Sequence, residues 1–239
     1  MWLFAAGRRT LAQSADSGGI LVAASGVFRS SPLRLLPSQL TAIVLATSFS
    51  AGLNVYLTVA TLGLLARAEI LTLPPSLHSV ASWYVIAPCI FLFVIEFVAD
   101  KIPILDLVWN ALQTFVRVPV AALLAYGAST QLSQGAQLMA TLLGGAIALA
   151  AHTGKIAART AVSHSPEPFS NFALSIGEDG FVVFLTWFAS RHPYWASIIV
   201  LIALLIVFSL LGFVVRSFRN LFRGAKQSLA NTFRSDSPE

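Results

Sequence analysis

The sequence carries little charge and almost no cysteine. Only 10% of its 239 residues are Asp, Glu, Lys or Arg, whereas soluble domains carry about 25%. Hydrophobic residues make up 56% of the chain, and the mean hydropathy is +0.79. The single cysteine, Cys89, lies in an apolar run, so an intrachain disulfide is excluded and a thiolate metal site is not expected. This composition is typical of an integral membrane protein.

The sequence also lacks the short motifs of common enzyme classes. It contains no HExxH, GxSxG or CxxC motif, and no paired-aspartate motif of a lipid head-group transferase. We therefore expect a protein that is not an enzyme and needs no cofactor. A metal site built on His152, His164 and nearby acids is the alternative. The net charge is +5, but the basic residues flank apolar segments, so no nucleic-acid partner is expected.

Six apolar segments approach the length of about 20 residues that a spanning helix needs. The predicted fold class is therefore all-α, a polytopic membrane helix bundle with about six transmembrane helices. The third and fourth segments are short, so four crossings with two re-entrant segments is the alternative. The fourth helix could also continue past His152 into water. The expected spans are Leu40–Leu65, Ser82–Ala99 with a kink at Pro88, Val118–Leu132, Leu138–Ala151, Phe172–Ala189 and Trp195–Val215.

Lys and Arg residues are distributed unequally between the two sides of these spans. An alternating assignment puts thirteen of them on one side, and only Arg67 and Arg191 on the other. By the positive-inside rule, both termini are predicted to be cytoplasmic, in an inner membrane. The predicted domains are a poorly ordered extension (1–36), a transmembrane domain (37–217) and a basic tail (218–239). Arg8-Arg9 alternatively indicates a twin-arginine signal or a transit peptide.

The segment between the second and third spans has one polar helical face. Asp106, Asn110, Gln113 and Arg117 are spaced four, three and four residues apart, and apolar residues cover the opposite side. This pattern predicts an amphipathic helix. It either lies at the cytoplasmic interface, with Trp109 as an anchor, or is half-inserted with its polar face lining a cavity.

Several ionisable residues fall inside or at the edge of apolar segments. Glu96 and Asp100 are four residues apart, so a helix places them on one face. Glu178 and Asp179 lie about two turns into an apolar helix, where a charge costs roughly 2.5–3.5 kcal/mol. We expect these acids to meet partners or water rather than lipid. A structural ion pair of Glu178-Asp179 with a nearby base is the alternative to a binding role.

Polar residues also follow single faces of other spans. The stripe on the first span, Thr47, Ser50, Asn54 and Thr58, is equally consistent with helix packing. The loop 164–171 contains two prolines and is either a rigid connector or a broken-helix binding element. The candidate substrate- or ion-binding residues are Asn54, Glu96, Asp100, Lys101, Arg117, His152, Lys155, Arg159, Glu167, Asn171, Glu178 and Asp179.

Four stretches resemble a known family. They are Ser50–Asn54, Glu96–Pro103, Ser165–Asn171 and Ser175–Asp179. These motifs are similar to those of the bacterial integral-membrane family catalogued as domain of unknown function 4126, over about Leu40–Arg191. The resemblance implies a membrane protein and supplies no activity or substrate.

The buried charges lead to three functional hypotheses. The first is a transporter or carrier of a small solute or ion, with a polar cavity open to the cytoplasm, whose mouth is formed by Glu96 and Asp100. The second is binding or translocation of an anionic lipid by Lys101, Arg117, Lys155 and Arg159. The third is a non-catalytic membrane assembly factor. The lipid bilayer is the expected partner in each case, and a homo-oligomer is compatible with all three.

Overall fold

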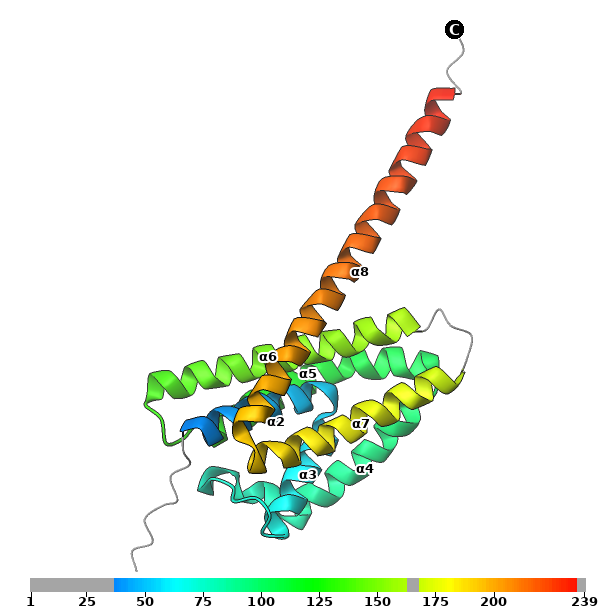
Figure 1. The fold of residues 1–239 in the computed structure, drawn as a ribbon. Helices are drawn as coiled ribbons and strands as arrows, with labels where there is room; N and C mark the ends of the chain where they lie inside the picture. The colour runs from blue at the N-terminus through cyan, green and yellow to red at the C-terminus, as the bar shows by residue number, and fades with distance from the viewer. Residues whose placement is uncertain (1–36, 163–167, 236–239) are drawn as a thin grey trace, which may run out of the picture. The chain divides into compact units, whose positions relative to one another are not determined.

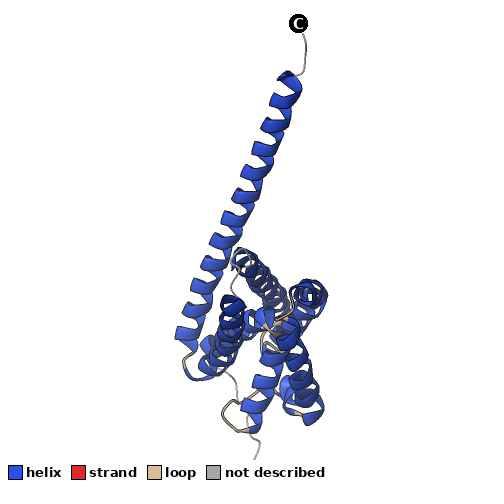
Figure 2. Cartoon of the chain, turned by 90° about the vertical axis from the view of Figure 1, so that its right-hand side faces the viewer, coloured by secondary structure: helices blue, strands red, loops and turns tan. Residues whose placement is uncertain are grey.

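The computed structural model describes residues 37–162 and 168–235, which lie within one compact unit starting at Leu36. Every regular element in these ranges is a helix (Figure 2), so the all-α prediction is confirmed. The predicted extension 1–36 lies outside the described residues. The elements are α2 (Pro37–Leu53), α3 (Val55–Arg67), the 3-10 helix η1 (Pro75–Ala81), α4 (Trp83–Ala99), α5 (Pro103–Ala128), α6 (Gln134–Val162), α7 (Pro168–Arg191) and α8 (Pro193–Ser235).

Within residues 37–162 and 168–235, four helices are long and apolar enough to cross a membrane, at Val108–Ala128, Gln134–Arg159, Phe172–Arg191 and Pro193–Ser217. Helices η1 and α4 meet at 59° and together form a fifth candidate, as a broken span or a re-entrant loop. These helices identify an integral membrane protein. Six crossings are not confirmed by the described residues, and the number of crossings stays a prediction.

The first predicted span is not one helix. The segment Leu40–Leu65 is divided into α2 and α3, and the two helices are separated at Asn54 (Figure 1). Each half is a short apolar helix of fewer than 18 residues. Hydropathy averages over such a break, because the residues on both sides are equally apolar. The prediction of an uninterrupted span was therefore wrong.

The separate amphipathic helix predicted before the third span is also absent. Helix α5 runs without interruption from Pro103 to Ala128, and Val118 lies in its middle. The polar face at Asn110, Gln113 and Arg117 is buried within the protein. Because these side chains are covered by other helices, they need no water interface, and the helix continues straight into its apolar half.

Helices α6 and α8 are longer than predicted. Helix α6 continues past His152, as expected, but His152 and Lys155 are buried instead of exposed to water. Helix α8 continues to Ser235, 18 residues beyond the end of its apolar part at Ser217. The predicted boundary of a C-terminal tail at 217/218 therefore falls inside a helix.

Helix α2 lies at the centre of the bundle. It contacts α3, α5, α6, α7 and α8, and α5 also packs along α6. Small residues allow these close approaches: a Cβ added to Gly52 would lie 2.4 Å from the carbonyl oxygen of Ala148, and one added to Gly144 would lie 2.5 Å from the Cβ of Ala125. The main apolar core joins α2, α6, α7 and α8 through Ala46, Phe49, Leu53, Ile147, Ala151, Val182, Leu185, Ala189, Ala196, Val200 and Val207.

Candidate functional site

The candidate site is organised around the break between α2 and α3. Asn54 lies between the two helices in an extended conformation, with φ −150° and ψ 103°. Its side-chain oxygen accepts a hydrogen bond from the main-chain N–H of Leu57 at 3.0 Å, which is the usual role of an N-cap. One polar residue therefore ends a helix and starts the next within an apolar segment. Main-chain groups at the two helix ends are left for side chains of other helices.

Arg117 connects α5 to three other elements. It is fully buried and forms an ion pair with Glu96 of α4, which is also fully buried. Its Nη1 donates to the carbonyl of Gly52 at 3.3 Å and to Nδ1 of His152 at 2.6 Å. A guanidinium group can only donate, so Nδ1 is an acceptor and the His152 proton is on Nε2. That nitrogen lies 2.8 Å from Thr114 Oγ1, so His152 is held as a neutral imidazole.

Lys155 of α6 lies among oxygens from three other helices. Its Nζ is 3.2 Å from the carbonyl oxygen of Leu53, the last residue of α2. It is 3.5 Å from Asp100 Oδ2, 3.5 Å from Glu178 Oε2 and 3.6 Å from Glu96 Oε1. Only 1% of the Lys155 side chain is exposed. The ammonium group therefore occupies a closed environment of three carboxylates and one helix-end carbonyl.

Two further contacts complete the cluster. Arg159 Nη2 donates to Asp100 Oδ2 at 2.6 Å and to Glu178 Oε2 at 3.1 Å, so it connects the end of α4 to α7. The side-chain amide of Asn54 donates to Asp179 Oδ1 at 3.1 Å. Asn54 therefore has two functions. Its oxygen caps α3, and its nitrogen binds an acid 125 positions away in the sequence.

Lys101 borders the cluster, immediately after α4. Its Nζ lies 4.0 Å from the centre of the Phe97 ring and 5.0 Å from that of Phe172, a cation–π geometry. Burial lowers the pKa of Lys101 below its ordinary value. Burial alone would raise the pKa of Asp100, but the positive charges of Lys155 and Arg159 outweigh it and hold that pKa below the ordinary range. Asp100 is therefore an anion at neutral pH.

The charges of this cluster balance. Four acids (Glu96, Asp100, Glu178 and Asp179) lie with four bases (Lys101, Arg117, Lys155 and Arg159). Balance matters because an uncompensated charge in a low-dielectric interior costs several kcal/mol or more. Some hydrogen-bonding capacity is nevertheless unused: Glu96 Oε2, Asp100 Oδ1 and Gln113 Oε1 are buried acceptors that meet no donor among the described residues. Buried oxygens without donors can accept a bound cation, a proton or a water molecule.

Residues 41–212 match the family model of the domain of unknown function DUF4126. The chain belongs to this family. The matched region includes the α2–α3 break and all eight members of the charge cluster. Neither the curated proteins nor the solved structures contain a match to the chain. The family assignment thus confirms the resemblance seen in the motifs, while the chemistry of this DUF4126 domain has to be inferred from its own residues.

Ten of the twelve candidate residues predicted from the sequence come together. They are Asn54, Glu96, Asp100, Lys101, Arg117, His152, Lys155, Arg159, Glu178 and Asp179. The ion pair that the sequence offered as the alternative to a binding role is present, since Glu178 lies 3.5 Å from Lys155 Nζ and 3.1 Å from Arg159 Nη2. Glu167 lies outside the described residues, as does the side chain of Asn171. The expectation that Glu96 and Asp100 form an open mouth was wrong, because their side chains are 0% and 4% exposed.

Sequence reasoning missed three contributors to the cluster. Thr114 positions His152, although no pattern distinguished it from an ordinary packing threonine. Gly52 and Leu53 contribute through their carbonyl oxygens, which no side-chain pattern can reveal. The signal that was available is Asn54 itself, since Asn inside a long apolar run is a favoured N-cap.

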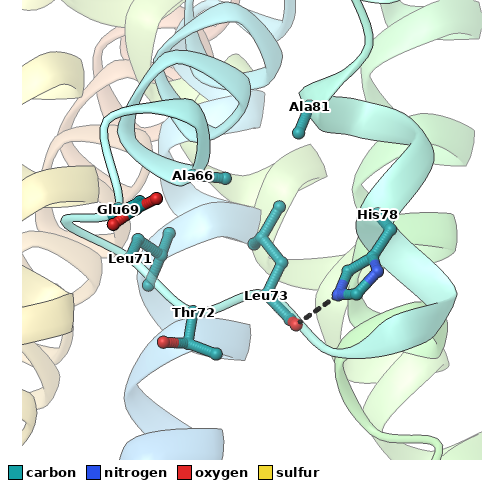
Figure 3. Close-up of a pocket in the computed structure, with 7 residues that line it drawn as sticks. All are labelled: Ala66, Glu69, Leu71, Thr72, Leu73, His78 and Ala81. Atoms are coloured by element: carbon teal, nitrogen blue, oxygen red, sulfur yellow. Dashed lines mark hydrogen bonds between the residues drawn. The ribbon is translucent and has the colours of Figure 1, made fainter.

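A cavity of about 280 Å³ lies at the other end of α3, away from the charge cluster. Figure 3 shows its lining residues, with His78 Nε2 donating to the carbonyl of Leu73 at 3.2 Å. Glu69 lies on its rim with φ +57°, in the left-handed region. It follows the C-cap of α3, where Gly is the usual residue. A non-glycine residue in this conformation costs roughly 1 kcal/mol.

Replacing Glu69 by Gly is expected to stabilise the protein by about 0.5–1 kcal/mol, because Gly adopts the left-handed conformation without steric cost. Thermal unfolding of the two purified proteins in the same detergent measures the difference. Glu69→Ala is the control. It also removes the carboxylate but keeps the strain, so it should not gain stability. Equal stability of the Gly and Ala variants would show that the conformation carries no cost.

Proposed function

We propose that this DUF4126 protein is a membrane carrier for a small solute or ion, and that the charge cluster at the α2–α3 break is its binding site. The observation that carries the proposal is the position of the break. A helix is interrupted within an apolar segment. The main-chain carbonyls of Gly52 and Leu53, at the end of α2, accept hydrogen bonds from the side chains of Arg117 and Lys155. Discontinuous helices with main-chain groups facing ions and charged substrates are a recurring feature of secondary transporters.

The arrangement of the charges supports the same proposal. The three bases that form ion pairs come from α5 and α6, whereas their acidic partners come from α4, its C-cap and α7. A solute that replaces one partner of an ion pair changes the attraction between these helices, and so it can bias one packing of the bundle over another. The cluster therefore couples occupancy of the site to helix position. An ion-pair network that serves stability alone has no need to lie at a helix break. Here the ion pairs join α4, α5, α6 and α7 at the break between α2 and α3.

Flux through proteoliposomes tests the carrier proposal. We expect the purified protein to conduct protons or small ions into liposomes above the rate of empty liposomes. The readouts are a pH dye in the lumen and currents on steps of NaCl, KCl and NH₄Cl. Glu178→Gln and Asp179→Asn should each reduce the flux by about tenfold or more, because each removes a charge from a buried balanced network.

Glu69→Gln is the matched control, since it removes one carboxylate at the opposite end of α3 and should keep the flux of the wild type. If Glu178→Gln and Asp179→Asn conduct as well as the wild type, the cluster is not a transport site. If all three variants fail alike, the effect is one of folding, and the melting temperatures of the purified variants would show it.

Anionic lipid binding is less well supported by the geometry. Arg117, Lys155 and Arg159 are each paired with buried acids, so they present no net positive surface to a head group. The expectations that the protein is not an enzyme, and that both termini are cytoplasmic in an inner membrane, remain predictions.

A further inference from the structure

The environment of the Lys155 ammonium group indicates what the site binds. Its four oxygen neighbours lie at 3.2–3.6 Å from Nζ: one main-chain carbonyl and one oxygen from each of three carboxylates. We name these four oxygens the ammonium cage: Leu53 O, Glu96 Oε1, Asp100 Oδ2 and Glu178 Oε2. The side chain that fills the cage comes from α6, whereas the cage belongs to α2, α4 and α7. The cage and its occupant are thus separate parts of the protein.

The cage does not depend on Lys155 alone for its construction. Arg117 holds the Glu96 carboxylate, and Arg159 holds both Asp100 and Glu178. The Leu53 carbonyl is fixed by the end of α2 at the Asn54 cap. With Lys155 displaced, three acids would face two arginines, which leaves one negative charge for a cation to neutralise. The buried Glu96 Oε2, to which no residue in the described part of the chain donates, offers a further acceptor in the same group.

The distances fit an ammonium ion better than a metal ion. Metal–oxygen bonds measure about 2.0–2.6 Å for magnesium and calcium, whereas the cage oxygens lie 3.2–3.6 Å from the nitrogen of Lys155. Among the described residues, no set of three His, Cys, Asp or Glu side chains is arranged to hold a metal. An ammonium group instead donates three hydrogen bonds to surrounding oxygens. The chemistry of the cage therefore suits a primary amine in its protonated form.

We infer that the site is a binding site for a small protonated amine or ammonium ion, and that Lys155 is a tethered substitute which occupies the cage when no free cation is bound. This inference rests on the proposed carrier function and names its class of solute. A free ammonium ion enters as the Lys155 side chain withdraws. Because the two cations compete for one set of oxygens, occupancy by solute changes the contact of α6 with α4 and α7.

Chemical rescue tests the cage directly. Lys155→Ala removes three methylenes and an ammonium group, because Ala keeps the β-carbon. The cation n-butylammonium carries the same ammonium group on an unbranched chain with one carbon more than was removed. We expect the full-length variant to melt below the wild type in detergent and to be stabilised by n-butylammonium chloride, and less by methylammonium chloride. Choline chloride should have no specific effect, because a quaternary ammonium cannot donate hydrogen bonds. Above the dissociation constant, each tenfold rise in n-butylammonium should raise the melting temperature by on the order of 3 °C.

Lys101→Ala is the matched control. It removes the same side chain and charge at the border of the cluster, but Lys101 contacts the rings of Phe97 and Phe172 instead of the cage. The inference is overturned if n-butylammonium stabilises Lys101→Ala as much as Lys155→Ala, or if choline does as well as n-butylammonium. If Lys155→Ala can be purified only with n-butylammonium in every buffer, the inference is supported.

If Lys155→Ala cannot be purified with or without n-butylammonium, Lys155→Gln is tested with ammonium chloride and with choline chloride. Equal stabilisation of Lys155→Gln by the two salts overturns the inference.

Uptake of labelled methylammonium into wild-type proteoliposomes separates this inference from the carrier proposal. Selective rescue without uptake supports the amine cage and contradicts the carrier. Uptake of other ions without selective rescue supports a carrier and contradicts the amine cage. Rescue together with uptake supports both.

Discussion

Arg117→Met is expected to lower the free energy of unfolding by about 3–5 kcal/mol, the range for removing one partner of a buried ion pair. The substitution leaves the fully buried Glu96 without its guanidinium partner. It also removes the donors to the Gly52 carbonyl and to His152 Nδ1. Met fills a similar volume, so the loss should come from the unpaired charge rather than from a cavity. Reversible unfolding in mixed micelles measures the change.

Two controls separate this charge effect from a general loss of arginine. Arg191→Met removes an exposed arginine from the last turn of α7 and should change stability by less than about 0.5 kcal/mol. The double variant Glu96→Leu/Arg117→Met should be more stable than Arg117→Met alone, because an apolar pair carries no unpaired charge. A double variant that is less stable than the single one would show that Glu96 does not depend on Arg117. In that case our account of the cluster is wrong.

Gly52→Ala is expected to cost about 3 kcal/mol, the upper end of the usual range for overpacking. The added Cβ would lie 2.4 Å from the carbonyl oxygen of Ala148 and 2.7 Å from the Cβ of Ala151. Because the nearest obstacle is main chain, α2 and α6 must move apart as whole helices. This movement would also displace the Gly52 carbonyl from Arg117 and the Leu53 carbonyl from Lys155. We therefore expect stability and flux to fall together.

Gly180→Ala is the comparison for this prediction, because it makes the same chemical change in a helix where the new Cβ meets nothing within 4 Å. It should be neutral or stabilising by up to about 1 kcal/mol, since Ala favours the helix. The measurement is again unfolding in mixed micelles. Similar melting behaviour of the two variants would show that α2 and α6 are not in the close contact described above.

Much of the fold could be predicted from local patterns. Long apolar stretches interrupted by prolines and charges predicted the apolar parts of α4, α6, α7 and α8. A chain that crosses lipid has to satisfy its backbone N–H and C=O groups with its own hydrogen bonds, and a helix does so. The break at Asn54 was missed because hydropathy is unaffected by one polar residue. The continuity of α5 was missed for a related reason: a polar face can lie against water or against other helices, and the sequence does not say which.

The candidate site was predicted as a set of residues but not as an arrangement. The cost of charge in an apolar environment indicated that Glu96, Glu178 and Asp179 need partners. It could not indicate that Glu96 pairs with Arg117, or that Asp179 is bound by Asn54. The same reasoning predicted a polar vestibule open to water. In the structure, the described side chains of the cluster are mostly buried.

The sequence alone determined that this chain is a helical membrane protein, and which ionisable side chains have to be neutralised inside it. Both follow from the free energy of transferring each residue out of water, which depends on residue type and local order. Tertiary structure decided where the first apolar segment breaks, which acid meets which base, and that Lys155 fills a cage built by three other helices. All three depend on how close segments that are far apart in the sequence come to one another in space. They arise only when the helices pack.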